Sequence, residues 1–144
     1  MTLLRMLIAF TLWSHAAVVG AADQPDFFRS WTIEKPVCPG RCGKFIMDYI
    51  TGFVGNPIDV GHDWFTNDMY ESCRRGARYD EIKEQDVAQV LAPYKVKASS
   101  LGIRQKTVWA GRVFCSNTPL ATLIYVNEKR MFLVFEQGVF VPLR

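Results

Sequence analysis

Three apolar segments near the carboxyl end of the chain constrain its fold more than any other feature. They span residues 121–126, 130–135 and 139–143, and turn residues separate them. This spacing is typical of an antiparallel meander. Apolar residues occupy nearly consecutive positions in these segments, so both faces of the sheet must be covered. We therefore expect a closed or nearly closed antiparallel barrel with a helix against one side.

The rest of the chain predicts more strands and two short helices. The further strands cover residues 28–34, 57–65, 94–103 and 106–115. Apolar residues recur at helical spacing between Gly43 and Gly52, which predicts a helix that stops at Gly52. Residues 80–92 predict a second helix that Asp80 caps. The expected fold class is mainly β with one or two short helices.

The amino terminus has the layout of a cleavable export signal. Arg5 precedes a short apolar run at residues 6–13, and small residues follow. The run is shorter than the roughly 20 residues that cross a bilayer, so we expect no stable membrane span. Cleavage after Ala21 or Ala22 satisfies the rule of small residues, and we prefer Ala22. Residues 1–22 are then a signal peptide, and residues 23–144 form one domain, either in a bacterial periplasm or secreted.

Four cysteines, Cys38, Cys42, Cys73 and Cys115, lie beyond the predicted signal. An even number in an exported chain indicates two disulfides, for which three pairings exist. The Pro39-Gly40 turn can bring Cys38 and Cys42 together, so we expect that pair and a second bridge between Cys73 and Cys115. The second bridge closes the longer loop and should therefore stabilise the fold more.

An alternative interpretation makes Cys38 and Cys42 a working thiol pair. Their CxxxC spacing, with a proline between them and a helix after them, resembles the copper site of thioredoxin-like copper chaperones. The chain lacks the alternating strands and helices of that fold, and no histidine stands where a third ligand is expected. A structural disulfide is therefore the preferred interpretation.

A second resemblance covers most of the region after the signal. Its residues are Trp31-x-Ile33, Cys73 followed by Tyr79, Ala98-x-x-Leu101-Gly102, Val113-x-Cys115, Gly138-Val139-Phe140 and Arg144. Their order is similar to that in small lipocalin-like β-barrels exported by bacteria. The resemblance implies an up-and-down barrel and supports the bridge from Cys73 to Cys115. It implies no single function, because such barrels bind ligands, inhibit enzymes or serve as structural modules. The segment 36–50 departs from the compact barrel pattern.

The residues after the signal offer little for catalysis. His62 is their only histidine, which excludes any triad or metal cluster that needs two. We interpret His62 as an ordinary turn residue and the nearby Asp59, Asp63 and Asp68 as a solvated face. No phosphate loop, zinc spacing or calcium loop is present. We therefore expect no enzyme activity, no cofactor and no metal site, and the small basic excess predicts no nucleic-acid partner.

A binding role has more support in the sequence. A loop rich in turn formers carries large apolar residues, and three arginines follow it. The candidate partner-binding residues are Trp64, Phe65, Tyr70, Arg74, Arg75 and Arg78. Aromatic side chains on a rim are common anchors of protein recognition, and arginine binds carboxylates with two hydrogen bonds. In the alternative interpretation the aromatic residues plug one end of the barrel and the arginines are solvated.

These observations favour an exported, non-enzymatic binding protein that engages another envelope or secreted protein, in the role of an inhibitor or immunity factor. One alternative is a carrier of a small apolar ligand in the barrel interior. Another is a thiol or copper-handling protein that uses Cys38 and Cys42.

Overall fold

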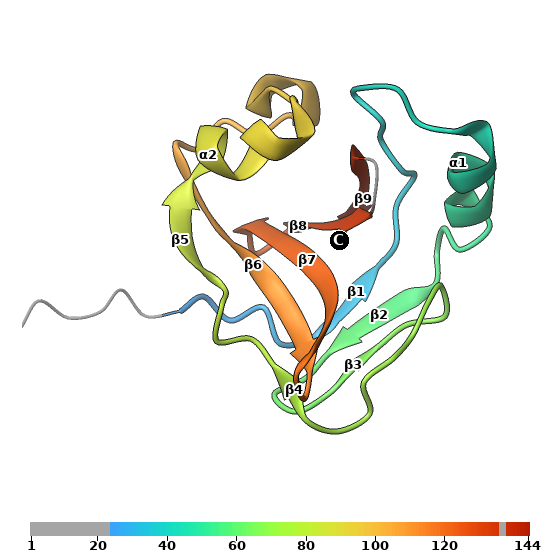
Figure 1. The fold of residues 1–144 in the computed structure, drawn as a ribbon, viewed down its shortest axis with the longest axis vertical. Coiled ribbons are helices and arrows are strands. Elements are labelled where there is room, and N and C mark those ends of the chain that lie inside the picture. Colours follow the sequence, from blue (N-terminus) through green and yellow to red (C-terminus); the bar gives the residue numbers. More distant parts are fainter. Residues whose placement is uncertain (1–23, 136–137) are drawn as a thin grey trace, which may run out of the picture.

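A computed structural model of the chain describes residues 24–135 and 138–144. The predicted signal peptide and its cleavage site lie outside these residues. Within them the protein is mainly β, with antiparallel strands and two short α-helices (Figure 1). The fold class expected from the sequence is confirmed at this level.

The described strands divide between two sheets. The first holds β1 (Ser30–Thr32), β2 (Pro57–Val60) and β3 (Phe65–Thr66) in that order. The second has the order β4-β6-β7-β8-β9, and β5 also pairs with β6. Its strands are β4 (Ala77–Arg78), β5 (Lys83–Asp86), β6 (Thr107–Cys115), β7 (Thr118–Asn127), β8 (Arg130–Phe135) and β9 (Val139–Leu143). The last two strands have the predicted bounds, and no closed barrel is found among the strands of the described residues.

Isolated backbone pairs join the two sheets at both edges. At one edge Thr32 and Arg144 exchange hydrogen bonds of 2.7 and 3.0 Å, and Val37 and Phe140 exchange bonds of 2.7 and 2.9 Å. At the other edge Phe65 in β3 exchanges two bonds of 2.8 Å with Cys73, which lies shortly before β4. The sheets therefore face each other across a shared interior.

Two apolar cores cover the two faces of the second sheet. The inner core lies between the sheets and contains the fully buried side chains of Trp31, Phe27 and Phe65. The second core lies under α2 (Val87–Leu91) and the short 3-10 helices Ala92–Tyr94 and Ala98–Leu101. Side chains of β8 alternate between the two cores. Met131 and Leu133 belong to the inner core, and Phe132 and Val134 belong to the second core. The expectation that both sheet faces are covered is confirmed.

The predicted helix before Gly52 is confirmed as α1 (Lys44–Thr51), which Gly52 ends. The prediction of a helix over residues 80–92 is wrong, because residues Lys83–Asp86 form a strand on β6 and only α2 is helical. Asp86, rather than Asp80, caps that helix by accepting hydrogen bonds from the amides of Ala88 and Gln89. The apolar residues at helical spacing in this segment pack into different cores. Ile82 belongs to the inner core, whereas Val87 and Leu91 belong to the second core.

Two predicted strands also take other forms. The segment 94–103 has Lys95 and Gly102 at φ values of 55° and 66°, which a strand does not accommodate, and it forms 3-10 turns. The segment 57–65 is a hairpin, since the Gly61 amide donates to the Trp64 carbonyl at 2.9 Å and β2 pairs with β3. His62 and Asp63 form its turn. Ile58 and Val60 face inward as expected.

Both expected disulfides are present, Cys38–Cys42 and Cys73–Cys115. Cys73 is fully buried in the inner core, and its bridge ties the segment before β4 to the end of β6. Two disulfides without a free cysteine in the described chain are typical of an oxidising compartment outside the cytoplasm.

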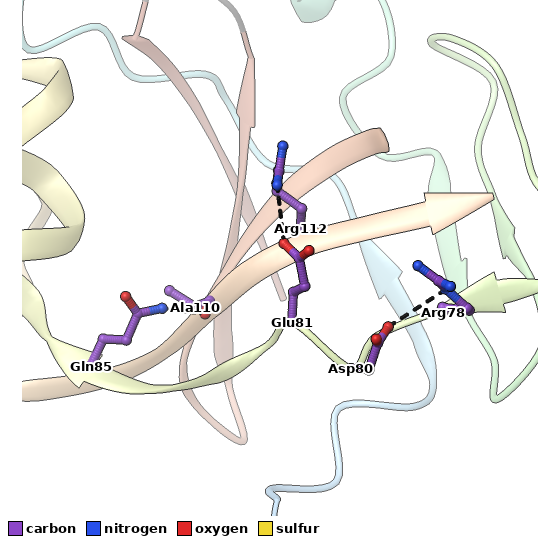
Figure 2. Close-up of polar contacts among 6 residues, drawn as sticks. All are labelled: Arg78, Asp80, Glu81, Gln85, Ala110 and Arg112. Carbon is purple, nitrogen blue, oxygen red and sulfur yellow. Dashed lines mark hydrogen bonds and ion pairs between the residues drawn. The ribbon is translucent and has the colours of Figure 1, made fainter. Parts of the chain in front are cut away.

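The segment that links β4 to β5 crosses over β6 at Gly111. A Cβ atom on Gly111 would lie 2.2 Å from the carbonyl oxygen of Glu81, so only glycine fits beneath this crossing. On either side of it, Arg112 binds Glu81 at 3.2 Å and Gln85 donates to the carbonyl of Ala110 at 2.6 Å (Figure 2).

Replacing Gly111 with alanine should lower the free energy of unfolding by roughly 1–3 kcal/mol, because the Glu81 backbone must move away from β6. Urea unfolding followed by circular dichroism measures this. Gly40→Ala is the matched control, since nothing lies within 4 Å of a Cβ atom there. Equal stability of the two variants would contradict the crossing.

Candidate interaction surface

The structure separates the aromatic residues that the sequence placed in one binding loop. Phe65 is 0% exposed and belongs to the inner core, so it is a core residue and not part of a surface. Tyr70 contacts Phe135 edge-on at 5.4 Å between ring centroids and packs against the same core. Trp64 is 46% exposed and faces solvent. Phe65 and Tyr70 thus fit the alternative interpretation of residues that plug one end of the interior.

The arginines remain at the surface, but they do not all face outward unpaired. Arg78 lies 3.6 Å from Asp80 (Figure 2). The guanidinium groups of Arg78 and Arg112 both lie over the ring of Phe114. Arg74 and Arg75 are exposed, and neither forms an ion pair with any residue that the structure describes. Because Phe65 pairs with Cys73, Arg74 lies beside Trp64 on the neighbouring segment.

Apart from Trp64, the large apolar side chains that are exposed in the described chain gather on α1 (Lys44–Thr51) and in the turn after it. Phe45, Tyr49 and Val54 are 83%, 40% and 45% exposed, and all three lie on α1 or in the turn after it. Phe45 and Tyr49 are one helical turn apart and share a face. The opposite side of α1 buries Ile50 against the inner core. The sequence carried a sign of this, since the apolar positions of the helix are too many for one buried stripe.

An apolar recess opens beside this face of α1. Phe45 and Ile46 of α1 line it together with Tyr70, Leu120 of β7, and Leu133 and Phe135 of β8. Its volume is about 460 Å³, within the range of small-ligand sites. We call it the α1 recess. Sequence reasoning missed it because its walls come from segments far apart in the chain.

Two contacts and a disulfide hold α1 in place. The Tyr49 hydroxyl donates to the carbonyl of Met69, and Ile50 is buried beneath the helix. Cys38 follows Val37, which is paired to β9, and its bridge to Cys42 brings the chain to the start of the helix. Gly43 caps the helix without a side-chain hydrogen bond. An eight-residue helix is not stable alone, so these tethers position the exposed face.

The inner core leaves little room for a carried ligand. Trp31, Phe27 and Phe65 fill the space between the sheets, and the Trp31 indole donates to the Phe27 carbonyl at 2.9 Å. The interior that the carrier hypothesis requires is therefore occupied by side chains in the part of the chain that the structure describes.

The residues considered for chemistry have structural contacts. His62 packs on Phe28 with ring centroids 4.1 Å apart, and an Asp63 carboxylate oxygen accepts from the Gly76 amide at 2.8 Å. Within the described ranges no group of three or more histidine, cysteine or acidic residues is placed to hold a metal. Cys38 and Cys42 are bonded to each other, so copper would need the reduced pair.

The Tyr70 hydroxyl is buried, and no hydrogen-bond partner for it is found among the described residues. Burial raises the pKa of Tyr70 well above its ordinary value of 10, and the nearby Tyr79 adds to the rise. Burial also raises the pKa of Tyr79, whose hydroxyl donates to the Trp64 carbonyl at 2.7 Å. A buried polar group without a partner destabilises the fold by roughly 1–3 kcal/mol.

Comparison with known proteins finds no matching family model, no matching curated protein and no matching solved structure. The similarity to exported lipocalin-like barrels therefore stays a prediction. No helix of residues 24–135 and 138–144 combines the length and the apolar character needed to cross a membrane.

Replacing Tyr70 with phenylalanine should keep or raise the free energy of unfolding at pH 7, because it removes an unpaired buried hydroxyl and keeps the ring. Tyr70→Ala should lower it by roughly 3–5 kcal/mol by leaving a cavity. Chemical unfolding of both variants measures these changes.

Tyr70→Phe should also change how the free energy of unfolding depends on pH above 10. Because burial raises the pKa of Tyr70 in the folded state, the unfolded chain loses this phenol proton first, and folding becomes less favourable as pH rises above 10 towards the folded pKa. Wild type should therefore lose stability above pH 10, and Tyr70→Phe should lose less. A Tyr70→Phe protein that is clearly less stable than wild type at pH 7 would show that the hydroxyl has a partner.

Proposed function

We propose that this chain is an exported, non-enzymatic binding protein that engages another protein through α1 and the α1 recess. The observation that carries the proposal is the gathering of exposed apolar side chains on α1, beside an apolar recess of about 460 Å³. Monomeric proteins rarely expose such clusters unless they serve an interaction.

The geometry of α1 favours recognition of a macromolecule. Phe45 projects from a helix that a disulfide, a hydrogen bond and a buried isoleucine hold in place. A preorganised aromatic anchor loses little conformational entropy on binding. The recess next to it can accept an apolar side chain from the partner, the arrangement found at energetically dominant positions of interfaces.

The scaffold and the expected compartment fit a role of this protein as an inhibitor or an immunity factor. The pairs Thr32–Arg144 and Phe65–Cys73 support a nearly closed, lipocalin-like barrel in which the two sheets act as one. The two disulfides support a site of action in a bacterial periplasm or in the medium outside a cell. Such a rigid body presents the same surface in the bound and unbound states.

Affinity capture from extract of the exported compartment tests the proposal with three forms of the protein. Wild type should retain one partner in stoichiometric amount. Phe45→Ser should lower the affinity for it by at least about tenfold, because removing a dominant anchor residue costs about 2 kcal/mol or more. Phe45 is so exposed that the fold should be unaffected.

Trp64→Ala is the matched control, because Trp64 is exposed on the first sheet, away from α1. It should retain the partner. Equal capture by wild type and Phe45→Ser, or no stoichiometric partner at all, would contradict the proposal.

The volume of the α1 recess favours a second candidate, a small apolar ligand held beneath Phe45 rather than in the packed interior. Native mass spectrometry of protein purified from its exported compartment separates the two. A bound small molecule adds its own mass to the chain, whereas a protein-binding surface leaves the mass unchanged.

A further inference from the structure

The outer face of the first sheet carries a row of hydrogen-bonding side chains. Ser30 of β1 pairs with Asp59 of β2, and Asp59 pairs with Thr66 of β3. Trp31 and Val60, their neighbours along the strands, point into the inner core, so these three side chains point outward. Ser30 is exposed, and Asp59 and Thr66 are half-buried. A carboxylate and two hydroxyls thus lie side by side across the three strands.

Trp64 forms a flat platform next to this row. A Cβ atom on Gly61 would lie 2.0 to 2.4 Å from three atoms of the Trp64 ring system, so the ring rests directly on the Gly61 backbone. Gly61 is buried under it, while Trp64 is 46% exposed. One face of the indole is therefore fixed on the sheet, and the ring cannot turn away without uncovering Gly61.

A shallow recess of about 390 Å³ joins the platform to the polar row. Phe28, Arg29, Ser30, Asp59, His62 and Trp64 line it. The Arg29 guanidinium is held over the Trp31 ring at 3.8 Å and donates to the carbonyl of Glu128. The recess therefore combines aromatic surface with fixed donors and acceptors. The Arg29 guanidinium is turned towards the buried Trp31 and the β7–β8 turn, so the polar groups beside Trp64 in the recess are the Ser30 hydroxyl and the Asp59 carboxylate. A hydroxyl-rich ligand can donate to this carboxylate and accept from this hydroxyl.

We propose that this recess, the Trp64 recess, binds an oligosaccharide. The C–H groups on one face of a six-membered sugar ring carry a small positive charge, and the face of an indole is negative. A sugar ring stacked on Trp64 would place its hydroxyls within reach of Asp59 and Ser30, which accept and donate hydrogen bonds. The site lies apart from α1 and does not depend on the proposed protein partner.

The test is a titration of the full chain with two β-1,4-linked probes, cellotriose and triacetylchitotriose, followed by the NMR signal of the Trp64 indole N–H. At least one probe should shift this signal with a dissociation constant on the order of 1 mM, as expected for one stacked ring and a few hydrogen bonds. Trp64→Ala and Asp59→Ala should each weaken binding at least about tenfold, read from the shifts of backbone amides in β2 and β3.

Control variants keep the outcomes separate. Asp59→Ala changes an outward side chain and leaves the Trp64 platform on Gly61, so its effect does not depend on the hairpin remaining intact in Trp64→Ala. Phe45→Ser should bind the sugars as wild type does, whatever it does to a protein partner. No shift at about ten times the expected dissociation constant would overturn the proposal. Equal affinity of wild type and Asp59→Ala would also overturn it, as would a stronger response to tetramethylammonium, which would indicate a cation site.

Discussion

The pairing of Phe65 with Cys73, locked by the disulfide from Cys73 to Cys115, is the interaction on which the rest of the structure depends. It ties β3 of the first sheet to β6 of the second at the edge where the chain would otherwise open. Thr32 and Arg144 do the same at the opposite edge through hydrogen bonds alone. With both edges joined, the large side chains between the sheets have one packed arrangement, and Trp31 is removed from solvent with its polar atom satisfied.

Because the interior is packed with side chains, any binding by this protein takes place at its surface. The Tyr70 ring lies where the interior meets the α1 recess, so the core ends in an apolar surface instead of an open ligand cavity. Some charged side chains are paired locally, as Figure 2 shows for Arg112 with Glu81 and Arg78 with Asp80. Exposed ion pairs of this kind contribute little to stability. What remains are two apolar features on different faces, α1 with Phe45 and the platform of Trp64.

The sequence predicted the parts of the fold that local pattern and covalent chemistry determine. Apolar runs and turn residues predicted the bounds of β8 and β9, and the even cysteine count predicted two disulfides, whose pairing was expected from the turn between Cys38 and Cys42. Residues 80–92 were mistaken for a helix because Ile82 and Leu91 face different cores, and spacing alone does not reveal which core an apolar residue serves. Trp64 directly precedes Phe65, the first residue of β3, and the two side chains lie on opposite sides, Trp64 exposed and Phe65 buried. The α1 recess depends on where α1 lies relative to β7 and β8, which no local pattern encodes.

Hydrogen exchange of backbone amides at the two joined edges tests most directly whether the sheets enclose one core. The informative donors are Cys73 and Phe65 at one edge and Phe140 and Arg144 at the other. If the edges are joined as described, the amides of Cys73, Phe65 and Phe140 should exchange as slowly as those in the middle of β6 and β7, with Arg144 somewhat faster at the chain end. Rapid exchange at either edge, with slow exchange confined to β6–β8, would contradict the account.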